Sequence, residues 1–265
     1  GNLEDITFRV LRTLKEVDLI AAEDTRNSQK LLNHFDIHTP MTSYHEYNKY
    51  DKAEYLVGLM LDGKNIACIT DAGTPGISDP GEVLVQKCYE AGIKVTSLPG
   101  PAACITALTM SGLSTRRFAF EAFLPADKKQ RAQILEELQD ETRTIILYEA
   151  PHHLVKTLEE LFKTLGSRKV RICRELTKKH ETVYADTLDG ALAHYRDIED
   201  PRGECVIIIE GADREDLNKQ KQQSWEEHMA LYEDMNRKDA MKQVAKDRGV
   251  SKRDIYQALL KSESN

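Results

Sequence analysis

A loop rich in glycine and proline is the part of this sequence best suited to hold a ligand. It has three glycines and two prolines between residues 73 and 81, after an apolar run at 66–69 and before a helical pattern from Glu82. Glycine lets the backbone approach a ligand closely, proline stiffens the loop, and amides at a helix start can hold an anion. Strand, glycine-rich loop and helix is the order used by ligand sites in open α/β sheets. A tight turn without a ligand is the alternative.

A second loop of small residues, Pro99 to Ala103, follows a predicted strand at 94–98. Small side chains permit close approach of a flat ligand, although an ordinary strand–helix turn has the same composition. The carboxyl ends of parallel strands meet at one edge of a sheet, so both loops should border the same crevice.

Charged residues also follow a strand predicted at 17–22. Asp24 and Arg26 lie at the carboxyl end of a strand, where α/β sheets usually carry their catalytic residues, but Asp24 or Thr25 could equally cap a helix.

The adjacent His152 and His153 lack the carboxylate or cysteine spacing of a metal site, so we expect no metal.

Composition narrows the class of protein. The chain has 265 residues, a net charge of -7 and a balance of 31% charged to 40% hydrophobic residues that is typical of globular proteins. Any RNA contact would need local basic patches. The five cysteines are scattered, mostly in apolar runs, and fit a reduced, cytoplasmic protein. We expect no membrane span, because no apolar run approaches the necessary length.

The alternation of strands and helices to about residue 112 predicts a parallel sheet. We expect an N-terminal α/β domain at 1–113, whose first strand lies outside the sequence, and a second α/β domain at 114–212. A polar linker at 213–223 and a helix-turn-helix-like module at 224–265 should follow. Residues 219–265 hold ten basic and eight acidic side chains, a net charge of +2, which suggests either RNA contact or a solvated helical pair.

Five motifs together resemble one family. They are GNLEDIT at 1–7, AEDTR at 22–26, DAGTPGISDPG at 71–81, LPGP at 98–101 and RELTK at 174–178. These motifs resemble the small-subunit ribosomal RNA methyltransferases I, which belong to the tetrapyrrole-methylase (class III) fold family. The resemblance covers nearly the whole chain. It departs at the start, where the family has a strand and a Pro-x before the Gly-Asn.

The resemblance implies two α/β domains with S-adenosylmethionine in the cleft between them, and a homodimer. The implied reaction is methyl transfer to the ribose 2′-hydroxyl of a cytidine in 16S rRNA of the small ribosomal subunit. A precorrin-type methyltransferase of the same fold, or a non-catalytic RNA-binding assembly protein, are the alternatives.

The resemblance also suggests site residues. The predicted cofactor-binding residues are Thr74, Pro75, Gly76, Ile77, Ala102, Ala103, Phe123, Tyr148, Glu149, Ala150, Gly203 and Glu204, with main-chain amides of Gly76, Ile77 and Ser78 as donors. The predicted catalytic group is Asp24, Arg26, Arg174, Glu175 and Lys178, in which cations clamp phosphates and carboxylates orient the hydroxyl. Arg174 and Glu175 could instead form a structural ion pair. The predicted RNA contacts are Arg116, Arg117, Lys128, Lys129, Arg131, Lys178, Lys252 and Arg253.

Overall fold

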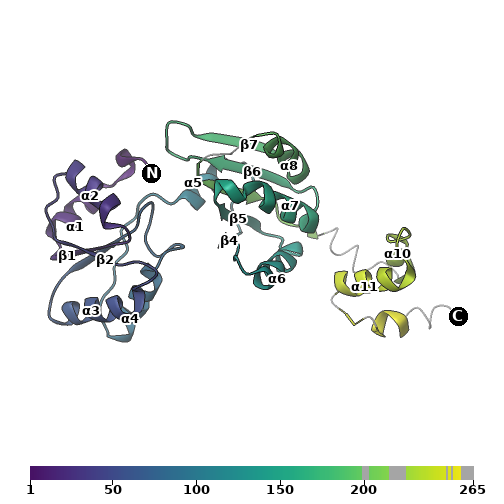
Figure 1. Ribbon diagram of the computed structural model, residues 1–265, viewed down its shortest axis with the longest axis horizontal. Helices are drawn as coiled ribbons and strands as arrows, with labels where there is room; N and C mark the ends of the chain where they lie inside the picture. Colours follow the sequence, from purple (N-terminus) through teal and green to yellow (C-terminus); the bar gives the residue numbers. More distant parts are fainter. Residues whose placement is uncertain (199–202, 215–224, 249, 252, 258–265) are drawn as a thin grey trace. The chain divides into compact units, whose positions relative to one another are not determined.

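The computed structural model describes residues 1–198, 203–214, 225–248, 250–251 and 253–257 (Figure 1). Its contacts divide the chain into two compact units, residues 1–139 with 143–210, and residues 140–142 with 211–265. Most of the predicted linker at 213–223, and Lys252, lie outside the described residues.

The first sheet of the larger unit is parallel, as predicted. Its strands are β1 (Leu19–Ala22), β2 (Met41–Ser43) and β3 (Ile66–Ile69), in the order β2-β1-β3. The helical elements of this part are η1 (Leu3–Asp5), α1 (Phe8–Glu16), α2 (Thr25–His34), α3 (Lys49–Leu61) and α4 (Gly81–Glu90). Helices α2 and α3 form the crossovers that parallel strands require.

Both faces of this sheet are covered, because neighbouring side chains of β1 point in opposite directions. Ile20 packs with Leu14 and Leu32 from α1 and α2. Ala21 packs with Leu56 and Leu84 from α3 and α4. The sheet therefore presents only its edges and strand ends to the surroundings.

The strand predicted at 94–98 is wrong. This segment has no strand assignment, although Val95 packs against the core formed by α3 and α4. A strand requires a neighbour that accepts and donates its backbone hydrogen bonds. The pattern at 94–98 therefore corresponds to two half-buried side chains, Val95 and Leu98, in a segment that pairs with no strand of the described chain.

The second sheet of the larger unit is mixed. It has the order β4-β5-β8-β6-β7, in which β4 is parallel to β5 and the other pairs are antiparallel. The strands are β4 (Phe118–Phe123), β5 (Thr144–Glu149), β6 (Lys169–Arg174), β7 (Thr182–Thr187) and β8 (Cys205–Ile209). The sequence analysis missed β7, an edge strand whose side chains are exposed or half-buried and so give no buried-strand pattern.

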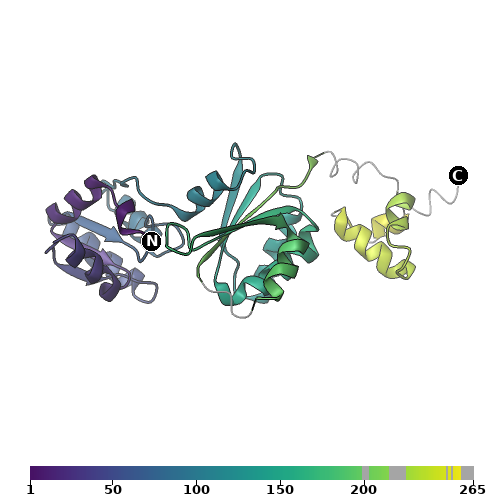
Figure 2. The ribbon, with the colours of Figure 1, turned by 90° about the horizontal axis from the view of Figure 1, so that it is seen from above.

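Helices cover both faces of the second sheet (Figure 2). They are α5 (Ala103–Met110), α6 (Lys128–Gln139), η2 (Pro151–His153), α7 (Leu154–Leu165) and α8 (Leu188–Arg196). Helices α6, α7 and α8 share one core with the sheet, whereas α5 packs on the opposite face. Helix α5 thus contacts the second sheet although it lies within the domain predicted at 1–113. That domain division stays a prediction.

The smaller unit is helical. It contains α10 (Trp225–Ala230), α11 (Arg237–Asp247) and a helical stretch at 253–257. Met241, Val244 and Ile255 belong to its core. Ser251 and Asp254 cap the last helical stretch, because they exchange side-chain to backbone hydrogen bonds. None of the helices that the structure describes is long and apolar enough to cross a membrane.

Candidate functional site

The glycine-rich loop is held together by one carboxylate. Asp79 accepts hydrogen bonds from the backbone amides of Gly76 (2.9 Å), Ile77 (3.3 Å) and Gly81 (2.8 Å). A side chain at Gly81 would collide with this arrangement, since its Cβ would lie 2.8 Å from Asp79 Oδ1. The expectation that the amides of Gly76 and Ile77 are free to bind a ligand is therefore wrong for this conformation. The loop is instead pre-shaped by internal bonds.

Two further contacts fix the position of this loop. The buried hydroxyl of Tyr44 donates to the carbonyl of Pro80 at 2.7 Å. Thr74 Oγ1 donates to the carbonyl of Pro101 at 2.9 Å, so the two predicted ligand loops lie side by side as expected. Tyr44 directly follows β2, and it thereby ties the end of β2, on the far side of β1 from β3, to the loop that follows β3.

Polar residues gather at the carboxyl ends of β1 and β3. The carboxylate of Glu23 accepts from the Thr70 hydroxyl (2.5 Å) and from the amide of Asp71 (3.3 Å). Asp24 caps α2 through the amide of Arg26 (2.8 Å) and pairs with its guanidinium at 2.9 Å. The hydrogen bonds from Arg26 lower the pKa of Asp24 below its ordinary value. Asp24 is thus a helix cap, and the Arg26 side chain is 89% exposed beside it.

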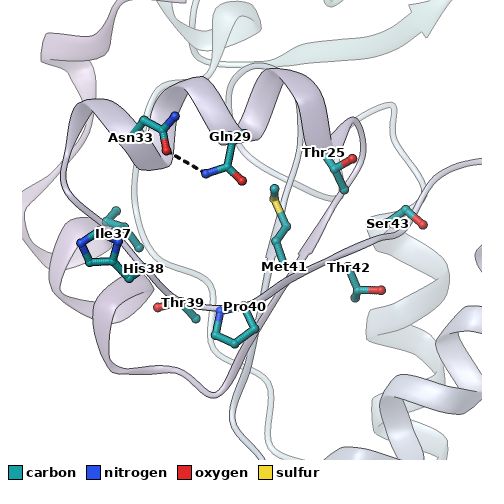
Figure 3. Close-up of a pocket in the computed structure, with 10 residues that line it drawn as sticks. All are labelled: Thr25, Gln29, Asn33, Ile37, His38, Thr39, Pro40, Met41, Thr42 and Ser43. Atoms are coloured by element: carbon teal, nitrogen blue, oxygen red, sulfur yellow. Dashed lines mark hydrogen bonds between the residues drawn. The ribbon is translucent and has the colours of Figure 1, made fainter.

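A polar pocket of about 610 Å³ begins at this edge of the first sheet (Figure 3). Thr25 and Ser43, next to the ends of β1 and β2, are part of its lining. Helix α2 forms one side of the pocket, and there Gln29 donates a hydrogen bond of 2.8 Å to Asn33. None of these residues except Thr25 was singled out from the sequence.

The start of α5 meets the end of β5. The backbone amide of Cys104 donates to the Tyr148 hydroxyl at 3.2 Å, next to the predicted cofactor residues Ala102 and Ala103. The ring of Phe123 lies 5.6 Å from that of Tyr148 and is 53% exposed. The structure therefore brings four predicted cofactor residues together: Ala102, Ala103, Phe123 and Tyr148.

Glu149 is buried, and each of its carboxylate oxygens accepts a hydrogen bond. Its carboxylate accepts from the Thr157 hydroxyl (2.5 Å) and from the amide of Ala150 (2.8 Å). Arg131 donates to Thr157 at 2.7 Å and pairs with Glu160 at 2.5 Å. Glu149 therefore shapes the turn at Ala150. The guanidinium of Arg131, predicted to contact RNA, is committed to this internal network.

A third cluster forms where β6 ends and β8 begins. Lys178 Nζ lies 2.9 Å from Glu175 and 3.1 Å from Glu204. The hydrogen bond from Lys178 lowers the pKa of Glu175. Burial lowers the pKa of Lys178, but hydrogen bonds to Glu175 and Glu204 outweigh it and raise that pKa overall. Gly203 allows close approach, since a Cβ there would lie 2.3 Å from Glu175 Cγ.

Arg174 does not form the ion pair considered from the sequence, because among the described residues Glu175 pairs with Lys178. The Nε of Arg174 is buried and has no hydrogen-bond partner within the described part of the chain. Glu175 and Thr177 both adopt positive φ, at 50° and 64°. These uncommon backbone angles are held by hydrogen bonds from the amide of Glu175 to the carbonyl of Glu204 (3.0 Å) and from the amide of Thr177 to Glu181 (2.7 Å).

The predicted catalytic residues lie in two groups in the structure. Asp24 and Arg26 belong to the first sheet, whereas Arg174, Glu175 and Lys178 belong to the second with Gly203 and Glu204. Of the predicted RNA contacts, Arg116, Arg117, Lys128, Lys129 and Arg253 are exposed. Sequence reasoning missed Asp79, Thr157 and the tie made by Tyr44, and only the D-P-G at 79–81 was a usable signal. The structure places no metal-binding group of three His, Cys, Asp or Glu side chains among the residues it describes.

Comparisons with known proteins agree with this architecture. Residues 1–192 match the family model "Tetrapyrrole (Corrin/Porphyrin) Methylases". The chain is 47% identical to "Ribosomal RNA small subunit methyltransferase I" of Halalkalibacterium halodurans, over 97% of this chain and 90% of that protein. The protein of the same name from Synechocystis sp. is 44% identical, over 100% and 96%.

A solved structure, the uroporphyrin-III-C-methyltransferase from Thermus thermophilus, shares the fold. Its TM-score is 0.56 at 17% identity, and the match covers 78% of this chain and 89% of that one. The family match over 192 residues, together with the fold shared with this solved structure, shows that the chain belongs to the tetrapyrrole methylase family, whose methyl donor is S-adenosylmethionine.

Proposed function

We propose that this protein transfers a methyl group from S-adenosylmethionine to the ribose 2′-hydroxyl of a cytidine in 16S rRNA of the small ribosomal subunit. The observation that carries the proposal is the identity of 47% and 44% to two small-subunit rRNA methyltransferases I, each matched over at least 90% of its length. The solved tetrapyrrole methyltransferase is only 17% identical, so it supports the fold alone.

The loops suit the cofactor. We assign its contacts to Thr74, Pro75, Gly76 and Ile77, to Ala102 and Ala103, and to Phe123, Tyr148, Glu149, Ala150, Gly203 and Glu204. Gly73 and Gly76 have φ of 78° and 84°, and among the described residues other than its chain neighbours, a Cβ at Gly76 would meet only Glu82 N, at 4.0 Å. The backbone is thus open on the glycine side, where a ligand could approach. The exposed side chains of Ile77 and Phe123 offer apolar walls.

The reaction makes modest demands on the protein. When bound, the cofactor supplies a methyl group on a positively charged sulfur and leaves as a neutral thioether, so no general acid is needed. Holding the hydroxyl in line contributes on the order of 7–11 kcal/mol. A base adds about 10²–10⁴-fold in rate, because a ribose hydroxyl is a weak nucleophile.

Two groups of this chain have the chemistry to hold the RNA. Arg26, Arg174 and Lys178 suit phosphates, and Asp24 and Glu175 suit the hydroxyl. The hydrogen bonds that keep Asp24 and Glu175 ionised also keep them able to accept a hydrogen bond. The exposed Arg116, Arg117, Lys128 and Lys129, with Lys252 and Arg253 of the helical module, would add sequence-independent contacts. We further propose a cytoplasmic homodimer that uses no metal.

The test is tritiated methyl transfer to purified 30S subunits, with free 16S rRNA and a precorrin as parallel acceptors. We expect label in 16S rRNA and one linkage resistant to mild alkali, since a methylated 2′-oxygen cannot attack its neighbouring phosphate. Label on the precorrin alone would identify a tetrapyrrole methyltransferase. Absence of both label and calorimetric cofactor binding would identify a non-catalytic protein.

A further inference from the structure

Two tyrosines next to the first sheet are exposed in a way that the proposed site does not explain. Tyr47 lies in the turn between β2 and α3, and Tyr50 lies in the first turn of α3 (Figure 1). Their side chains are 98% and 63% exposed. Burying aromatic rings is a main source of stability, so adjacent rings left in solvent point to a binding surface.

The position of this turn connects it with the proposed acceptor site. The amide of Tyr44 donates to the carbonyl of Ala22 at 2.7 Å, which continues the pairing of β2 with β1 beyond Ser43. The residues after Tyr44 therefore emerge beside those after Ala22, which include Asp24 and Arg26. Tyr47 and Tyr50 thus follow the same end of the sheet as Asp24 and Arg26, which are proposed to hold the RNA.

The turn is rigid. Asn48 Oδ1 accepts from the amide of His45 at 2.8 Å, and the amide of Asn48 donates to the carbonyl of His45 at 3.0 Å. The bond from Tyr44 to Pro80 anchors its start to the glycine-rich loop. A rigid turn loses little entropy when it binds a ligand.

The chemistry of the turn fits nucleic acid bases. The ring of His45 lies 6.1 Å from that of Tyr47, and its Nδ1 is buried without a partner among the described residues. Lys49 Nζ pairs with Glu46 at 2.5 Å and lies 5.4 Å from the centre of the Tyr50 ring. Exposed aromatic rings are a usual means by which proteins stack unpaired bases.

We propose that Tyr47 and Tyr50 form a stacking platform for unpaired bases of the RNA substrate next to the nucleotide that is methylated. This inference rests on the proposed function, and it assigns to these two tyrosines the contact with the nucleotides that flank the methylated one. Exposed tyrosines also occur at interfaces between protein copies. Adjacency to Asp24, Arg26 and the glycine-rich loop favours the RNA.

Binding of a fluorescein-labelled single-stranded oligocytidine tests the proposal by anisotropy. We expect Tyr47→Ala and Tyr50→Ala each to raise the dissociation constant by about five- to 150-fold, the range for loss of one base–aromatic stack. Tyr47→Phe and Tyr50→Phe should bind as the wild type does, because phenylalanine keeps the ring. Cofactor affinity by calorimetry should not change.

Tyr55→Ala is the matched control. Tyr55 is 54% exposed on the same helix and has Lys52 Nζ at 4.5 Å from its ring. Five residues turn a helix by about 140°, so Tyr55 faces away from Tyr50. We expect this variant to bind RNA normally.

Methyl transfer to 30S subunits distinguishes failure of the proposed function from failure of the stacking platform. If the wild type labels no rRNA, the proposed function fails, whereas the oligocytidine measurement still decides on the platform. If the wild type labels rRNA and the alanine variants keep both KM and RNA affinity, the platform is overturned. It is also overturned if these variants change the oligomeric state in analytical ultracentrifugation while RNA affinity is kept, since the tyrosines then form a contact between protein copies.

Discussion

The hydroxyl of Tyr44 donates a hydrogen bond of 2.7 Å to the carbonyl of Pro80, which lies 36 residues away in the sequence. This bond joins the end of β2 to the loop between β3 and α4. The Tyr44 side chain is buried, and burial raises the pKa of its hydroxyl, so the donor proton is retained at all physiological pH values. The glycine-rich loop is therefore held in place by its neighbours as well as by its own sequence.

The variant Tyr44→Phe should loosen that loop. It removes one buried hydrogen bond, a loss of about 0.5–1.5 kcal/mol, because the Pro80 carbonyl still accepts from the amide of Val83 at 3.1 Å. We expect a lower free energy of unfolding in urea and a several-fold weaker calorimetric affinity for S-adenosylmethionine. Tyr55→Phe, at an exposed position, is the control. Reduced stability with unchanged cofactor affinity would show that the loop does not depend on this bond.

Asp79 should be necessary for the shape of the loop. Asp79→Ala releases the amides of Gly76, Ile77 and Gly81, and Gly76 then loses the bonds that hold it at a φ of 84°. We expect a cofactor dissociation constant at least about tenfold higher, which corresponds to 1.4 kcal/mol. Asp79→Asn, which keeps one acceptor oxygen, should lie between the alanine variant and the wild type. Cofactor binding by Asp79→Ala at wild-type strength would contradict this role.

Lys178 should affect the RNA step more than cofactor binding. Lys178→Ala removes the cation that bridges Glu175 and Glu204, and it leaves these two carboxylates with no positive charge from Lys178 between them. We expect kcat/KM for 30S methylation to fall by about tenfold or more and calorimetric cofactor affinity to change less. Lys179→Ala is the matched control on the same turn. Equal losses in RNA methylation and cofactor affinity would place Lys178 in the cofactor site instead.

The helical module should lose stability on mild acidification. Arg248 Nε donates to His228 Nδ1 at 2.8 Å, and His228 Nε2 lies 3.3 Å from Asp247, an arrangement that requires neutral histidine. Burial lowers the pKa of His228 below 6.5. Because the folded pKa lies below the unfolded value, the contribution of His228 is complete above pH 6.5 and is lost as the pH falls through the folded pKa.

Amide NMR signals of α10 and α11 measure unfolding of this module separately from the rest of the chain. We expect its thermal midpoint to fall between about pH 7 and pH 5 in the wild type. The variant His228→Gln should be less stable at pH 7 and show a flatter dependence on pH. The same slope in both proteins would assign the effect to other groups.

The sequence determined the local structure well. The helix predicted from Glu82 is confirmed as α4, which begins one residue earlier, and the apolar run at 66–69 is β3. These elements were predictable because glycine, proline and cap residues act over three or four positions. The parallel first sheet followed from the alternation of strands and helices, and the family followed from motifs that keep their spacing.

Tertiary structure decided what depends on partners distant in the sequence. The segment at 94–98 has a strand-like composition but no pairing, whereas the exposed β7 pairs with β6. Arg131 and Lys178 are both basic residues near predicted site loops, yet one joins a buried network and the other bridges two strand ends. Hydrogen bonds and ion pairs depend on distances in space, and the pattern of one segment carries no information about which distant segment will lie beside it.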